Sequence, residues 1–177
     1  MEFIKTGIAG YGIVGKRRAE CIEKNKNLKL IAVCDKDFDK KGIMPDGVRY
    51  YKKYADLLDD DLEALIVCMS NDIAAEVVIA GIDKGLHVFC EKPPGKSFED
   101  ILQIEKRYKD NKHLKIMYGF NHRYHESVKD AMGIIKSGKL GKLINLKGVY
   151  GKSKIITFNQ SNWRTKRHIA GGGVLLD

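Results

Sequence analysis

The feature that most constrains the fold is a glycine loop near the N-terminus. Gly10, Gly12 and Gly15 form a GxGxxG motif after the apolar run Phe3–Ala9, and Asp35 closes the next apolar run. In a dinucleotide site the first glycine permits a tight strand-to-helix turn, the second lets the pyrophosphate approach the backbone, and the third lets helix and strand pack closely. A bare GxGxxG motif is often only a glycine-rich turn, but here strand, loop, helix and acid are in register.

The acid after the second strand indicates which dinucleotide to expect. Asp35 would accept hydrogen bonds from the adenosine ribose, and its carboxylate, together with Asp37, would repel the 2′-phosphate of NADP. Lysines that follow could offset this repulsion: Lys36, Lys40 and Lys41. We therefore expect NAD as the cofactor, with NADP less favoured.

Apolar runs and helical stretches alternate over the first two thirds of the chain. Continuous apolar runs at Leu30–Cys34 and Ala64–Met69 are typical of parallel strands covered on both faces. Shorter strands fit Val48–Tyr51, His87–Cys90 and Lys115–Tyr118. Helices are predicted at Lys16–Asn25, Asp72–Lys84 and Ser97–Asp110. This alternation predicts an α/β domain over residues 1–120, a doubly wound parallel (Rossmann) sheet.

The pattern changes after residue 120. A helix is predicted at Glu126–Lys136, and residues 142–150 then alternate between apolar and polar, as in an antiparallel strand with one exposed face. Residues 121–177 therefore read as the incomplete start of an α+β domain with an open antiparallel sheet. The apolar face with Ile144, Leu146 and Tyr150 favours a homo-oligomer formed through this sheet.

Charge and composition exclude several classes of protein. The net charge of +9 is uneven, because residues 1–118 carry 21 Lys and Arg against 20 acids, whereas residues 119–177 carry 11 against 3. This basic part is either a solvated lysine-rich surface or a field that attracts an anionic substrate. The basic residues are dispersed and no nucleic-acid motif accompanies them. No apolar run approaches the roughly 20 residues of a membrane span.

The N-terminus and the cysteines indicate the compartment. The chain enters a predicted strand within its first residues, which leaves no room for a signal peptide. The four cysteines lack CxxC spacing and are expected to be reduced, buried small hydrophobes: Cys21, Cys34, Cys68 and Cys90. Both observations predict a cytoplasmic protein.

Three further segments carry a family resemblance. Glu91-Lys92-Pro93 follows a predicted strand, Gly119–Tyr124 opens the second part, and Trp163-Arg164 precedes the final stretch Gly171–Asp177. With the glycine loop, these segments resemble the glucose–fructose oxidoreductase, inositol dehydrogenase and rhizopine-catabolism (Gfo/Idh/MocA) family over the whole chain. The residues of the Glu-Lys-Pro segment and of the final segment are most similar to those of members that act on sugars or nucleotide sugars in surface-polysaccharide pathways.

The resemblance implies an NAD-dependent oxidoreductase that transfers a hydride between nicotinamide and a sugar or nucleotide-sugar hydroxyl. Lys92 matches the lysine between nicotinamide and substrate, and Asp177 matches the aspartate of an Asp-x-x-x-His catalytic pair. The histidine of that pair is not among the 177 residues. Because a base must take the hydroxyl proton, we expect this chain to be inactive alone. The alternative is a non-catalytic dinucleotide-binding sensor or assembly protein.

The residue assignments follow from the motifs and the resemblance. The expected cofactor-binding residues are Gly10, Tyr11, Gly12, Ile13, Val14, Gly15, Asp35, Ser70, Asn71, Glu91 and Lys92. The expected catalytic residues are Lys92 and Asp177, and the expected substrate contacts are Lys92, Arg123, Trp163, Arg164 and Asp177. His122 and His125 lack a third ligand nearby, so no metal site is expected. Arg18 stands where many family members have a histidine, and Pro93 is a candidate for a cis peptide bond.

Overall fold

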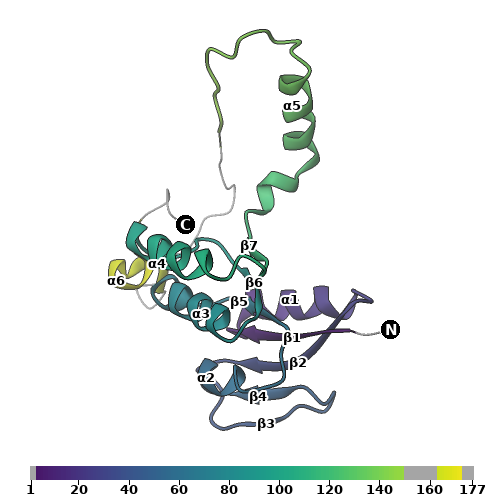
Figure 1. Ribbon diagram of the computed structural model, residues 1–177, viewed down its shortest axis with the longest axis vertical. Coiled ribbons are helices and arrows are strands. Elements are labelled where there is room, and N and C mark those ends of the chain that lie inside the picture. The colour runs from purple at the N-terminus through teal and green to yellow at the C-terminus, as the bar shows by residue number, and fades with distance from the viewer. Residues whose placement is uncertain (1–2, 150–162, 173–177) are drawn as a thin grey trace.

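A computed structural model describes residues 3–149 and 163–172. Residues 3–120 form one seven-stranded sheet with helices on both faces (Figure 1). The strands are β1 (Ile4–Ala9), β2 (Leu28–Cys34), β3 (Gly42–Ile43), β4 (Arg49–Tyr51), β5 (Ala64–Val67), β6 (His87–Cys90) and β7 (Ile116–Tyr118). The helices are α1 (Ile13–Glu23), α2 (Tyr54–Leu57), α3 (Asn71–Asp83), α4 (Phe98–Lys109), α5 (Glu126–Lys136) and α6 (Arg167–Ala170), with 3₁₀ turns η1 (Asn121–Tyr124) and η2 (Trp163–Thr165).

The sheet has the strand order β3-β4-β2-β1-β5-β6-β7. The chain adds strands on one side of β1 and then returns to its other side, which is the doubly wound topology that the alternation predicted. The predicted doubly wound parallel sheet is confirmed, and it carries one antiparallel strand at its edge, because β3 runs antiparallel to β4. Pro45 and Asp46 lie at the centre of the turn between them, which the Gly47 amide closes by donating to the Met44 carbonyl at 2.9 Å, with Gly47 at φ +85°. A connection this short can only reverse the chain.

Alternate residues of the central strands enter two separate cores. Ile8 and Val33 face α1 and pack on Ile22. Their neighbours in the strands point the other way, into a larger core under α3 and α4 that includes Leu65 and Val77. Figure 1 shows α1 on one face of the sheet and α3 and α4 on the other. This double cover explains the continuous apolar runs.

The helix starts follow local chemistry. Ser97 caps α4, because its Oγ accepts from the Asp100 amide at 3.3 Å while the Asp100 carboxylate accepts from the Ser97 amide at 3.0 Å. These two hydrogen bonds form a capping box, and the predicted bounds of α5 are confirmed. Two cysteines depart from the expected burial, since Cys21 lies exposed on α1 and Cys68 is half-buried.

Residues 121–149 differ from the sheet domain in their burial. The α5 helix projects away from the sheet in Figure 1, and none of residues 121–149 is buried. The strand predicted at residues 142–150 was wrong within the described residues, because 143–149 form no strand. A strand needs a partner for its amides and carbonyls, and no described segment pairs with it. Tyr150 lies outside the described residues.

Residues 163–172 return to the first domain. The Asn71 Nδ2 of α3 donates to the Ala170 carbonyl of α6 at 2.9 Å, which joins residues 99 positions apart. Gly171, at φ +82°, lies so close to Lys96 that a Cβ would stand 2.3 Å from the Lys96 carbonyl oxygen. No helix within the described ranges combines the length and apolar character needed to cross a bilayer.

Candidate functional site

The carboxyl ends of β1 and β5 form the topological switch point of the sheet. Backbone hydrogen bonds continue past the strands here, from Gly10 N–H to the Cys34 carbonyl at 2.9 Å and from Cys68 N–H to the Ala9 carbonyl at 2.7 Å. Residues from both sides of β1 are therefore held at one edge. In open α/β sheets this crevice is where ligands bind.

The three glycines of the loop meet different constraints. Gly10 has φ +91°, and a Cβ there would lie 2.5 Å from the Cys68 carbonyl oxygen. At Gly15 a Cβ would lie 2.0 Å from the Gly10 carbonyl oxygen, so the loop folds tightly onto the first turn of α1. By contrast, nothing lies within 4 Å of a Cβ at Gly12. The fold itself requires glycine at positions 10 and 15, whereas position 12 opens to solvent.

The first turn of α1 follows directly from this loop. Gly12 is the N-cap in an extended conformation, Ile13 is exposed and Val14 is half-buried. The α3 helix also begins at this edge, with Ser70 as its N-cap. The partial positive charges of two helix N-termini therefore face the same edge, which suits an anionic diphosphate.

The Asp35 carboxylate is tied to the glycine loop. Its Oδ2 accepts from the Tyr11 amide at 2.7 Å, and its Oδ1 accepts from the Asp37 amide at 3.1 Å. Asp35 is half-buried, and its own amide donates to the Tyr51 carbonyl at 3.0 Å. The structure thus places an oriented carboxylate beside the open Gly12 backbone. Residues with these properties fit a dinucleotide whose ribose hydroxyls donate to the acid.

The Glu91-Lys92 turn lies at the end of β6, on the same edge. The peptide bond between Lys92 and Pro93 is cis, as the sequence suggested. The Glu91 amide donates to the Val67 carbonyl at 2.8 Å, which fixes the start of the turn beside β5. Lys92 is exposed. The chain therefore presents a lysine at the carboxyl edge, two strands away from the glycine loop.

Arg18 is a residue of this site that the sequence did not assign. From α1 its Nε donates to Glu91 Oε1 at 2.6 Å, and its guanidinium lies 5.0 Å from the centre of the Phe89 ring. The two paired side chains are only 24% and 16% exposed. The ion pair joins the helix that follows the glycine loop to the turn that carries Lys92. Its position one helical turn after Gly15 was the available signal.

Two expected cofactor residues use their side chains within the protein. Asn71 is 3% exposed and donates to α6, as described above. The Ser70 Oγ donates to Asp72 Oδ1 at 2.6 Å. Both residues lie at the edge where they were expected, but their side chains bind the protein itself.

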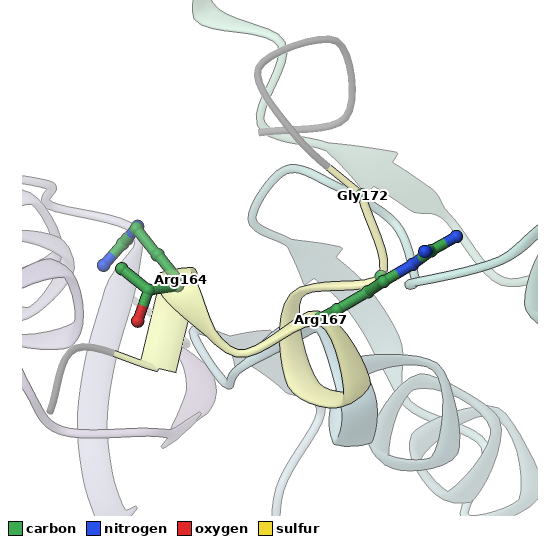
Figure 2. Close-up of a pocket in the computed structure, with 5 residues that line it drawn as sticks. Arg164, Arg167 and Gly172 are labelled. Atoms are coloured by element: carbon green, nitrogen blue, oxygen red, sulfur yellow. The ribbon is translucent and has the colours of Figure 1, made fainter. Parts of the chain in front are cut away.

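The residues expected to contact the substrate lie in separate segments of the structure. Arg123 lies exposed in η1, directly after β7, whereas Trp163 and Arg164 lie in η2. The Arg164 guanidinium stacks 4.4 Å from the centre of the Trp163 ring. A cavity of about 410 Å³ is lined by Arg164, Thr165, Arg167, Gly171 and Gly172. Figure 2 shows Arg164 and Arg167 pointing to opposite sides. Asp177 lies outside the described residues.

Within the described residues, the remaining histidines and cysteines supply no metal site. The rings of His122 and His125 stack at 5.2 Å, and the described residues hold no group of three or more His, Cys, Asp or Glu placed to bind a metal. Burial raises the pKa of the Cys34, Cys68 and Cys90 thiols to about 12. These three thiols therefore stay protonated at neutral pH and are poor nucleophiles.

The chain is similar in sequence to known proteins. A family model described as an oxidoreductase family with an NAD-binding Rossmann fold (GFO_IDH_MocA) matches residues 4–120. The chain is 29% identical over 154 residues to inositol 2-dehydrogenase of Salmonella typhimurium, covering 82% of this chain and 45% of that protein. It is 27% identical to glucose-6-phosphate 3-dehydrogenase of Bacillus subtilis, covering 90% of this chain and 46% of that protein.

A solved structure agrees with these sequence matches. Scyllo-inositol dehydrogenase from Lactobacillus casei, with bound NAD(H) and scyllo-inositol, aligns with a TM-score of 0.69 and 26% identity over 79% of this chain and 43% of that one. The chain thus spans less than half the length of the relatives it matches. The matched residues, 4–120, begin at the start of β1 and end two residues after β7, so they include the whole sheet. The chain therefore belongs to the Gfo/Idh/MocA family of oxidoreductases.

Proposed function

We propose that this chain binds NAD and forms the cofactor-holding part of a dehydrogenase that acts on a hydroxyl of a sugar or polyol. The observation that carries the proposal is the open Gly12 backbone beside the Asp35 carboxylate, which is already oriented by the Tyr11 amide. A bound NAD supplies a hydride acceptor. The pyrophosphate would lie against the N-terminus of α1, and the adenosine ribose would donate to Asp35.

Lys92 is the residue that we assign to the reaction itself. Its turn follows β6 at the same edge, and the Arg18–Glu91 ion pair holds the preceding residue. An ammonium at this place would stabilise the negative charge that develops on the hydroxyl oxygen as its proton leaves. We assign the proton acceptor to the histidine of the family's Asp-x-x-x-His pair, of which only Asp177 is among these residues. The test of the proposal therefore measures binding and not turnover.

The substrate that we propose is a sugar or polyol, with an anionic sugar favoured. The matched relatives are named as inositol and glucose-6-phosphate dehydrogenases, which supports this class. The excess of 11 Lys and Arg over 3 acids in residues 119–177 supports an anionic member of it. A nucleotide sugar belongs to the same class, because its diphosphate is also anionic.

Gly12 allows a direct test, because its Cβ position is empty. In the free protein Gly12→Ala adds a methyl group to open space and leaves an extended backbone conformation that alanine adopts freely. In the complex the same methyl group would stand where the pyrophosphate approaches the backbone. We expect NAD affinity, measured by calorimetry, to fall at least tenfold, with an unchanged melting temperature.

The matched control is Gly133→Ala in α5, where a Cβ also meets nothing within 4 Å. This variant should bind NAD like the parent chain. If the parent chain binds neither NAD nor NADH at millimolar concentration, the proposed function is wrong. If it binds both but Gly12→Ala binds equally well, the cofactor lies elsewhere.

A further inference from the structure

Residues 163–172 contact the sheet domain at two places. Asn71, the first residue of α3, donates from its Nδ2 to the Ala170 carbonyl at 2.9 Å. Gly171 lies against the backbone at Lys96, where a Cβ would stand 2.3 Å from the Lys96 carbonyl oxygen. Figure 1 shows α6 beside α3, with which it is in contact. The segment is therefore held by two elements that are far from it in the sequence.

Both places belong to the edge of the sheet where the cofactor is proposed to bind. The α3 helix begins at this edge. Lys96 lies in the loop between β6 and α4, which also carries Lys92. One short segment therefore bridges the start of α3 and the loop with the proposed catalytic lysine. Its docking decides where Trp163 and Arg164, the expected substrate contacts, lie relative to that edge.

The hydrogen bond from Asn71 is the buried part of this contact. Asn71 is 3% exposed and Ala170 is 4% exposed, whereas the other residues of the segment are half-buried or exposed. Because the segment buries little apolar area, the loss of a buried hydrogen bond should weaken its docking strongly. The α6 helix has only four residues, and a helix this short is not stable by itself in water. Its helical hydrogen bonds therefore depend on the docking.

We propose that Asn71 is a positioning residue that holds residues 163–172, with Trp163 and Arg164, at the edge where NAD binds. The inference rests on the proposed function, because it takes this edge as the cofactor site. It gives the buried amide of Asn71 a task that differs from the cofactor contact expected from the sequence. Even fully extended, the chain from Trp163 to Ala170 spans at most about 25 Å. The docked segment therefore keeps the Trp163 ring near the start of α3.

Hydrogen exchange in the free 177-residue chain tests the role of Asn71 in docking. The Ala170 amide donates to the Lys166 carbonyl at 2.9 Å, and the Gly171 amide makes the next such bond at 2.8 Å. Both amides should exchange slowly only while the segment is docked. At neutral pH Asn71→Asp keeps the size of the side chain, removes the Nδ2 donor and places an acid that suits a helix N-terminus. Exchange of both amides should become about tenfold faster.

Asn111→Asp is the matched control. The Asn111 Nδ2 also donates to a backbone carbonyl, that of Arg107 at 3.0 Å, but just after the end of α4. This variant should leave the exchange of Ala170 unchanged. Asn71→Ala should speed that exchange as Asn71→Asp does, because neither new side chain offers a donor.

Energy transfer from Trp163 to bound NADH tests the position of the segment. Trp163 is the single tryptophan of the chain, and tryptophan emission overlaps the absorption of NADH. The measurement uses saturating NADH, checked by calorimetry, so that a change of affinity does not enter. Exciting Trp163 should give nicotinamide emission in the parent chain and in Asn111→Asp. Most of this emission should be lost in Asn71→Asp and in Gly171→Ala, which places a Cβ against the Lys96 carbonyl oxygen.

The outcomes separate this proposal from the proposed function. A parent chain that binds no NADH contradicts the proposed function, whereas the exchange of the Ala170 amide still decides whether Asn71 holds the segment. Equal exchange in Asn71→Asp and Asn111→Asp overturns the positioning role. Bound NADH with the same energy transfer in the parent chain and in Asn71→Asp overturns it as well.

Discussion

Residues 3–120 and residues 121–149 have similar kinds of side chain but opposite packing. In the first region Leu65 is 0% exposed and lies in the core under α3 and α4. In the second, Ile144 is 94% and Val149 is 88% exposed, and no residue is buried. Apolar residues at helical or alternating spacing thus occur in both regions. Such spacing therefore predicts which face of a helix or strand is apolar. It does not predict whether another element covers that face.

One ion pair and one helix start from each region illustrate this contrast. The first region has the half-buried Arg18–Glu91 pair and the capping box at Ser97, whereas in the second Lys129 and Glu126 pair on the surface of α5. The N-cap of α5, His125, makes no side-chain capping bond. Three paired substitutions, one in each region, test whether packing accounts for the difference. Each compares free energies of unfolding from denaturant titration.

The largest difference is expected for truncated apolar side chains. Leu65→Ala leaves a cavity in the centre of the sheet and should cost about 2–5 kcal/mol. Ile144→Ala removes methyl groups that water already surrounds and should change stability by less than about 0.5 kcal/mol. If Ile144→Ala costs as much as Leu65→Ala, residues 140–149 are packed in solution and the comparison fails.

A smaller difference is expected for the ion pairs. Arg18→Met leaves the Glu91 carboxylate, 16% exposed, without its partner and should cost about 2 kcal/mol, below the range for fully buried pairs. Lys129→Met breaks a pair whose side chains are 50% and 82% exposed and should cost roughly 0–0.5 kcal/mol. Adding Glu91→Gln to Arg18→Met should recover part of the loss. No recovery would mean that Arg18 acts through its packing on Phe89.

The smallest difference is expected for the helix caps. Ser97→Ala removes the oxygen that accepts from the Asp100 amide and should cost about 1 kcal/mol. His125→Ala removes no capping bond, so its effect should stay within about 0.5 kcal/mol. Equal losses in the two helices would show that the cap of α4 contributes nothing beyond side-chain size.

Much of the first region could be predicted because its signals are local. Apolar runs, capping residues and glycines predicted the strands other than β3, and the helices α1, α3 and α4, within one to three residues. The predicted bounds of β6 and α5 agree with the structure. The glycine loop and Asp35 could be placed together because the doubly wound topology brings the ends of β1 and β2 to one edge. The family resemblance was confirmed over residues 4–120. The roles assigned to Lys92, Arg123 and Asp177 stay predictions.

Other features could not be predicted from spacing. The antiparallel β3 has only two residues, too few for a periodic signal. The expected strand at residues 142–150 had the right alternation but lacks a partner among the described segments. The bond from the Asn71 side chain to the Ala170 carbonyl was not predicted, and the assignment of Asn71 to the cofactor site stays a prediction. Association of copies through the exposed apolar side chains also stays a prediction.

The sequence by itself determined the conformation of short segments, because glycines, caps and apolar spacing act on the residues beside them. It thereby specified the turn at Gly10, the cap at Ser97 and the two-sided burial of the central strands. Only the tertiary structure decided which distant groups meet: Arg18 with Glu91, and Asn71 with the Ala170 carbonyl. These pairings depend on where the sheet brings each segment. No local pattern encodes that placement, since it results from all the packed elements together.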